Sequence, residues 1–122
     1  MSDACFFDSY ALYELIKGSS NYAGFKSTLM VFTKLNVFEV YYALLMDGKS
    51  DNAETFISEY YDYSVDLDET IIQKAAKFKL SYKERKLSLV DCVGYFVAAQ
   101  YGIKFLTGDK QFEDLPNVEF VK

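Results

Sequence analysis

Short apolar segments alternate with longer helical segments along this chain, and this alternation limits the possible folds more than any other feature. Strands are predicted at residues 4–7, 29–32, 63–67 and 103–107, with a last edge strand at 118–121. Helices are predicted at 8–17, 34–48, 50–61, 68–82 and 87–101, and residues 19–25 suggest another short helix. Apolar strands joined by helices form parallel sheets that are covered on both faces. We therefore predict an α/β fold, a three-layer α/β/α sandwich with a central, mostly parallel sheet, in a single domain over residues 1–122.

Local signals set the expected ends of these elements. Gly18 and Gly102 follow helical segments and are expected to end them. Ser50 or Asp51 is the expected N-cap of the helix at 50–61. Pro116 marks a turn before the last strand.

The chain contains no histidine, which excludes several kinds of active site. Ser-His-Asp and Cys-His nucleophile systems, imidazole acid–base catalysis and histidine metal sites are all ruled out. The two cysteines, Cys5 and Cys92, lie in apolar runs and are expected to be small buried hydrophobic residues of a reduced protein. No secretory signal or membrane-spanning run is visible, so a cytoplasmic location is expected.

Four acidic residues each interrupt an apolar segment: Asp8, Glu39, Asp91 and Asp109. Three of them have a local explanation. Asp8 can cap the first helix, Asp91 can complete a capping box begun by Ser88, and Asp109 can stabilise a turn. Glu39 has none, because the sequence around it is apolar on nearly every helical face.

Taken together, the four acids favour a shared metal site. Asp8 and Asp109 follow predicted strands, and ligands of parallel α/β sheets bind at the carboxyl ends of the strands. Clustered carboxylates repel one another, and a divalent cation removes that cost. With oxygen ligands alone, the expected ion is Mg²⁺ or Mn²⁺. Structural ion pairs remain the alternative explanation for charges in apolar surroundings.

The chain resembles the PIN domain family over essentially its whole length, and in particular the small VapC-type toxin ribonucleases. The resemblance rests on FFDSYALYELIKG, LNVFEVYYALL, the closing LPNVEFV and, most specifically, LSLVDCVGYFVAAQYGIKFLTGDKQF. It implies that Asp8, Glu39, Asp91 and Asp109 chelate Mg²⁺ or Mn²⁺. It also implies supporting polar roles for Ser9, Asn36 and Thr107, and a loop position for Asp114. A homodimer and an antitoxin partner encoded nearby are further implications of the resemblance.

The chemistry implied by this resemblance is endoribonuclease cleavage of RNA by a metal-activated water. In-line attack would leave a 5′-phosphate and a 3′-hydroxyl. The reaction needs no histidine, in agreement with the composition.

A net charge of −5 does not favour RNA binding unless a cation or a local basic patch offsets it. Residues 74–86 hold six of the 13 basic residues, and Lys79, Lys83, Arg85 and Lys86 are the candidate RNA contacts. A solvated helix face and loop is the alternative interpretation. Tyr82 is either a base-stacking residue or ordinary packing.

Two other functions remain open. A catalytically silent PIN-like module would bind only RNA or a partner protein. A receiver-type phosphoacceptor domain has a similar length and an acidic Mg²⁺ pocket. Receiver domains, however, have an acidic pair after the first strand and a Lys-Pro after the fifth. Here Asp8 stands alone and Lys104 precedes Phe105.

Overall fold

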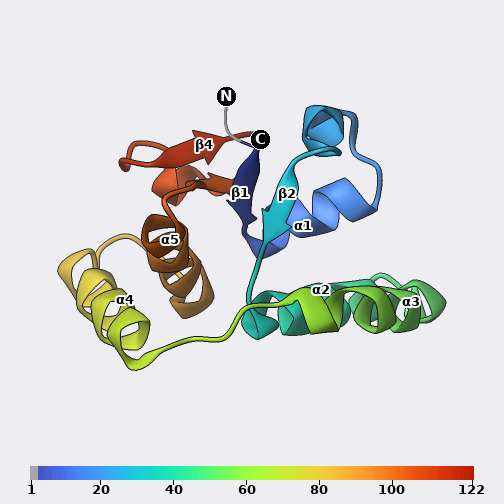
Figure 1. The fold of residues 1–122 in the computed structure, drawn as a ribbon, viewed down its shortest axis with the longest axis horizontal. Coiled ribbons are helices and arrows are strands. Elements are labelled where there is room, and N and C mark those ends of the chain that lie inside the picture. The colour runs from blue at the N-terminus through green and yellow to red at the C-terminus, as the bar shows by residue number, and fades with distance from the viewer. Residues whose placement is uncertain (1–2) are drawn as a thin grey trace.

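The computed structural model, which describes residues 3–122, contains one four-stranded parallel sheet (Figure 1). The strands are β1 (Ala4–Phe7), β2 (Leu29–Val31), β3 (Lys104–Thr107) and β4 (Val118–Phe120). Their order is β2-β1-β3-β4, so β1 and β3 form the centre and β4 is an edge strand as predicted. All three strand pairs are parallel.

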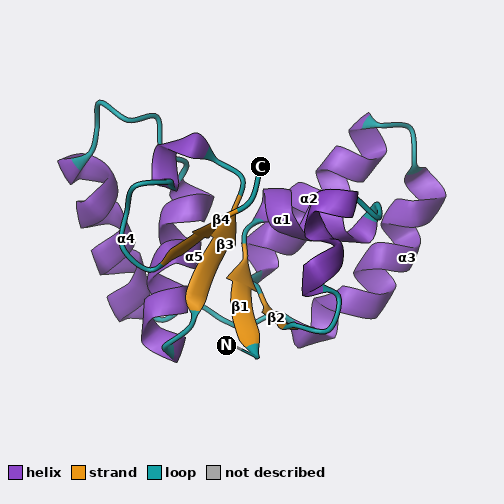
Figure 2. Cartoon of the chain, turned by 90° about the horizontal axis from the view of Figure 1, so that it is seen from above, coloured by secondary structure: helices purple, strands orange, loops and turns teal. Residues whose placement is uncertain are grey.

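Helices cover both faces of this sheet. Helices α1 (Ser9–Ile16), α2 (Lys34–Met46) and α3 (Ser50–Tyr60) lie on one side, and α4 (Glu69–Ser81) and α5 (Leu89–Tyr101) lie on the other. Figure 2 shows the sheet between these two groups. Short 3-10 helices occur at Ser20–Phe25 (η1), Tyr61–Tyr63 (η2) and Lys110–Phe112 (η3). The predicted three-layer α/β/α sandwich is therefore confirmed.

Alternating side chains of β1 supply the two hydrophobic cores. Phe7 packs with α1, α2 and α3, while Phe6 packs with α4 and α5, and both are completely buried. Phe6 stacks on Phe105 of β3, with ring centroids 5.8 Å apart. Cys5 and Cys92 are buried and free, one in each core, as the sequence indicated. Because both faces of the central strand β1 are covered, it is a continuous apolar run.

Side-chain caps fix several helix starts. Asp8 accepts a hydrogen bond from the Ala11 backbone N–H at 2.7 Å, and Ser88 accepts one from the Asp91 backbone N–H at 2.9 Å. Gly18 and Gly102 have φ angles of 82° and 68° where α1 and α5 end. These predicted helix boundaries are confirmed to within one or two residues.

Two expectations are wrong. Residues 63–67 are not a strand: only Val65 pairs, through a single parallel bridge to Thr33. Tyr63 belongs to the 3-10 turn η2 and Asp68 caps α4, and the short stretch between them adds no full strand to the sheet. The expected N-cap of α3 is also wrong: Lys49 is the N-cap, without a side-chain capping bond, and Ser50 and Asp51 lie inside the helix.

Over residues 3–122, no helix is both long enough and apolar enough to cross a bilayer.

Candidate active site

Two of the four predicted acids lie at the carboxyl edge of the central strand pair. Asp8 directly follows β1, and Asp109 is the second residue after β3. Phe7 is paired with Leu106 in the parallel register, and the Asp8 backbone N–H donates to the Leu106 carbonyl at 3.1 Å. Adjacent parallel strands therefore bring Asp8 and Asp109 to the same edge of the sheet.

The other two acids reach the same place from helices on opposite sides of the sheet. Asp91 is the third residue of α5, and Glu39 lies in the middle of α2. One cavity of about 410 Å³, here called the carboxylate cavity, is lined by Asp8, Ser9, Tyr10, Glu39, Ser88, Asp91 and Asp109. No basic residue is among these seven, so no side chain on the cavity wall neutralises the acids.

Asp8 and Asp109 combine local structural roles with their place in the cavity. One oxygen of Asp8 caps α1, and the other accepts a hydrogen bond from the Thr107 hydroxyl. Asp109 donates its backbone N–H to the Thr107 hydroxyl oxygen at 3.0 Å and accepts from the Gln111 N–H at 2.9 Å. Asp8 is therefore a helix cap and Asp109 a turn residue, as the local explanations predicted. Both residues also line the carboxylate cavity, so a local role does not exclude a place in a shared site.

A chain of buried and partly buried polar groups fixes Glu39. The Ser9 hydroxyl donates to Glu39 Oε1 at 2.5 Å, and the Asn36 amide donates to Ser9 Oγ at 3.0 Å. Asn36 Oδ1 in turn accepts from the backbone N–H and the hydroxyl of Thr33, both at 2.9 Å. Asn36 is only 1% exposed, so it orients Ser9 from inside the protein. Sequence reasoning missed Thr33, which forms a capping box with Asn36 at the start of α2; the signal was Thr-x-x-Asn, a variant of the Ser/Thr-x-x-Glu/Gln pattern.

Electrostatic repulsion is evident in the carboxyl groups. Burial and the nearby Asp91 charge raise the pKa of Asp8 to about 8, against the opposing effect of its hydrogen bond from Thr107. Burial and the Glu39 charge raise the pKa of Asp91 to about 7, against a hydrogen bond with Ser88. Asp109 adds to the repulsion at both groups. The site therefore disfavours its own ionised form unless positive charge is brought to it.

The chemistry of the side chains fits a hard divalent cation. Four carboxylates and the hydroxyl groups of Ser9 and Ser88 are the oxygen donors that Mg²⁺ and Mn²⁺ prefer. Within residues 3–122, however, no three His, Cys, Asp or Glu side chains already stand close enough together to hold an ion. The acids surround the cavity without forming a closed ligand set.

The basic segment of α4 and the following loop lies outside this cavity. Lys79 donates to the Leu87 carbonyl at 2.5 Å. Arg85 makes two hydrogen bonds to Asp114, at 2.8 and 3.0 Å, and its guanidinium lies 4.9 Å from the Tyr82 ring centroid. Of the four predicted RNA contacts, Lys83 and Lys86 are exposed and Lys79 and Arg85 are partly buried, and none lines the cavity. Asp114 lies in a loop, as expected, and pairs with Arg85.

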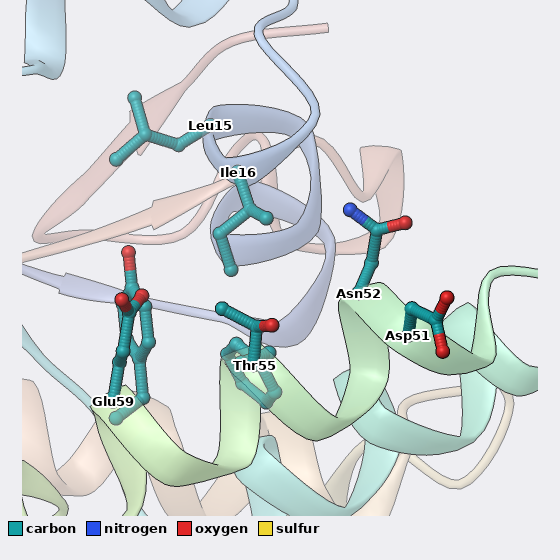
Figure 3. Close-up of a pocket in the computed structure, with 8 residues that line it drawn as sticks. Leu15, Ile16, Asp51, Asn52, Thr55 and Glu59 are labelled. Carbon is teal, nitrogen blue, oxygen red and sulfur yellow. The ribbon is translucent and has the colours of Figure 1, made fainter.

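A second hollow of about 420 Å³ lies between α1 and α3, and we call it the α1–α3 groove. Figure 3 shows Ile16 on α1 pointing toward Thr55 on α3, with Leu15 beside it on α1. Asp51 and Glu59 also line this groove, but none of the four predicted site acids does. It is therefore separate from the carboxylate cavity.

Comparison with known proteins agrees with this architecture. The profile of the PIN domain family matches residues 5–118. No curated protein matches the chain significantly. Among solved structures, VapC20 of Mycobacterium tuberculosis, described as a sarcin-ricin loop cleaving toxin, has 16% identity and a TM-score of 0.78. That match covers 98% of this chain and all of VapC20.

Two further structures share the fold. A toxin–antitoxin complex from Klebsiella pneumoniae has 17% identity and a TM-score of 0.73, over 95% of this chain and 96% of the other. PAE2754 from Pyrobaculum aerophilum has 16% identity and a TM-score of 0.68, over 97% of this chain and 90% of the other. The family profile spans nearly the whole sequence. The chain therefore belongs to the PIN domain family.

Proposed function

We propose that this protein is a Mg²⁺- or Mn²⁺-dependent endoribonuclease and the toxin of a type II toxin–antitoxin pair. The observation that carries the proposal is the convergence of Asp8, Glu39, Asp91 and Asp109 on one cavity with no basic residue on its wall. VapC20, a toxin described as cleaving the sarcin-ricin loop, shares the fold and supports RNA as the substrate class.

The roles of the residues follow from their contacts. The four carboxylates are the proposed metal ligands and RNA-cleaving groups. Thr107 holds Asp8 in place, and Asn36 holds Ser9 against Glu39. A divalent cation bound there would polarise the scissile phosphate, offset its charge and make an attacking water more acidic. Because the chain has no histidine, carboxylates are the cavity side chains able to take up the proton. In-line attack would leave a 5′-phosphate and a 3′-hydroxyl.

Metal-dependent cleavage is the direct test. The purified chain is expected to cleave a labelled single-stranded RNA with Mg²⁺ or Mn²⁺, and to lose all cleavage when the ions are chelated. Re-addition of either ion should restore the activity, which separates metal removal from damage to the protein. RNA binding without cleavage under every condition would instead identify a catalytically silent PIN-like module.

The proposed antitoxin needs a surface on this chain, and the α1–α3 groove has suitable chemistry. Leu15 and Ile16 supply apolar surface, while Asp51 and Glu59 add negative charge. An apolar protein segment that carries lysine or arginine would complement both features. The solved toxin–antitoxin complex with the same fold supports such a partner.

The proposed homodimer would use a different surface. Phe38, Tyr42, Leu45 and Met46 lie at helical spacing on α2, with exposed fractions of 70%, 58%, 42% and 68%. This α2 stripe carries no charge, so two copies of an acidic chain can meet there without repulsion.

Sedimentation is expected to report a dimer, and Phe38→Glu should dissociate this dimer into monomers. Addition of the protein encoded by the neighbouring gene should increase the mass further. A monomer at all concentrations would exclude the dimer.

A further inference from the structure

Tyr10 occupies a position that the proposed chemistry does not explain. It directly follows Ser9 at the start of α1 and is the one aromatic residue among the seven that line the carboxylate cavity. The residue is 41% exposed, whereas Phe6, Phe7 and Phe105 on the central strands are completely buried. Core packing alone does not account for a large, partly open ring beside four acids.

The ring is held against the loop that carries Asp109. A Cβ atom built on Gly108 would lie 2.2 Å and 2.5 Å from two carbons of the Tyr10 ring. Gly108 is therefore glycine because the ring occupies the place of a side chain. The Tyr22 ring supports Tyr10 from another side, with centroids 6.2 Å apart at 62°, and the Tyr22 hydroxyl donates to the Val121 carbonyl.

A fixed ring with an open surface is suited to bind a flat apolar group. The bases of single-stranded RNA stack on aromatic side chains, and this attraction does not require positive charge. That matters here because the cavity wall is acidic and repels the phosphate backbone. Tyr82, the aromatic residue considered from the sequence, instead packs beside Arg85, Phe78 and the core.

We propose that Tyr10 is a substrate-binding residue whose ring stacks on the base next to the scissile phosphate. This inference rests on the proposed ribonuclease function. Tyr10 and the four acids line the same cavity. If the phosphate of a nucleotide lies among the carboxylates, its base is therefore within reach of the Tyr10 ring. Stacking on Tyr10 would thus determine which phosphate of the RNA lies next to the four acids. It would select only weakly among the four bases.

The test compares Tyr10→Leu with Tyr10→Phe on a short labelled RNA and on copies that carry one abasic residue at each position in turn. Binding is followed by fluorescence anisotropy with Ca²⁺, and cleavage is followed separately with Mg²⁺ or Mn²⁺. Tyr10→Leu is expected to weaken binding of the intact RNA by about 10-fold, within the range known for base–aromatic stacking. Tyr10→Phe keeps the ring and should recover most of that affinity.

The abasic copies distinguish stacking from a structural role. At one position, the abasic RNA should bind the unaltered protein about 10-fold more weakly, and Tyr10→Leu should cause no further loss on that RNA. Tyr101→Leu, at an exposed tyrosine near the end of α5, is the matched control and should bind every RNA as the unaltered protein does.

The possible outcomes distinguish the stacking role of Tyr10 from the proposed ribonuclease function. An equal loss in Tyr10→Leu on every RNA, or no loss at all, would overturn the stacking role. Position-specific loss without any cleavage would support stacking and overturn the ribonuclease function. No detectable RNA binding by the unaltered protein would overturn both.

Discussion

Asp91→Asn is expected to reduce RNA cleavage by at least about 100-fold, because a proposed metal ligand is lost. The same substitution is expected to make the metal-free protein more stable. The reason for the second effect is the repulsion within the carboxylate cavity. The Asp91 charge raises the pKa of Asp8, and the Glu39 charge raises that of Asp91. Asparagine keeps the shape and removes the charge. Without divalent cations, we expect the free energy of unfolding at pH 8 to rise by about 1 to 2 kcal/mol.

The pH dependence of stability gives an independent check on this explanation. Both carboxyls have a higher pKa in the folded protein, so the folded state binds more protons than the unfolded state between about pH 4 and pH 8. Their contribution to stability is complete below that window and is lost as the pH rises through about 7 and 8. Metal-free protein should therefore unfold more easily at pH 8 than at pH 5.5. Asp91→Asn and added Mg²⁺ should each reduce this difference.

Urea unfolding of the metal-free protein, measured at both pH values, gives these free energies. Asp62→Asn is the matched control, because Asp62 is exposed in η2 and does not line the cavity. It should change neither cleavage nor stability appreciably. If Asp91→Asn destabilised the metal-free protein, or cleaved RNA at the full rate, Asp91 would not belong to a repelling cluster of metal ligands.

Gly94→Val is expected to destabilise the protein by about 3 kcal/mol, through overpacking between α5 and the sheet. A Cβ atom at Gly94 would lie 2.5 Å from a ring carbon of Phe6 and 3.1 Å from one of Phe105. Both rings are completely buried and stacked, so they have little room to move. Because Asp91 is one helical turn earlier on α5, a displaced helix would also carry Asp91 away from Asp8, and cleavage should fall.

Gly24→Ala is the matched control for this substitution. No atom lies within 4 Å of a Cβ built at Gly24, and its φ is not positive, so its free energy of unfolding should change by less than about 0.5 kcal/mol. Urea unfolding of the three proteins makes the comparison. A loss below about 1 kcal/mol in Gly94→Val would mean that the two rings give way and that the contact does not fix the position of α5.

Local sequence patterns were enough to predict most helices and strands. The apolar runs of β1 and β3 reflect burial on both faces, and Asp8, Ser88, Gly18 and Gly102 act through backbone groups a few residues away. Residues 63–67 were the failure. Their alternating pattern suits a strand, but a strand needs a hydrogen-bonded partner along its length, and only Val65 is paired.

The functional set was partly visible in the sequence. Charged residues inside apolar segments are costly unless something compensates them, so Asp8, Glu39, Asp91 and Asp109 stood out from their surroundings. Tyr10 did not stand out among 11 tyrosines. The sequence also gave no sign that Arg85 pairs with Asp114 or that Lys79 binds the Leu87 carbonyl.

The sequence by itself determined most of the order of elements, several helix caps and the acids that break the apolar runs, because each depends on residues close together in the chain. Only the tertiary structure decided which side chains meet. Parallel pairing of β1 with β3 brings Asp8 to Asp109, and helices packed on opposite faces bring Glu39 and Asp91 to the same cavity. Contacts between residues 30 to 100 positions apart depend on strand register and helix packing, which no local pattern specifies.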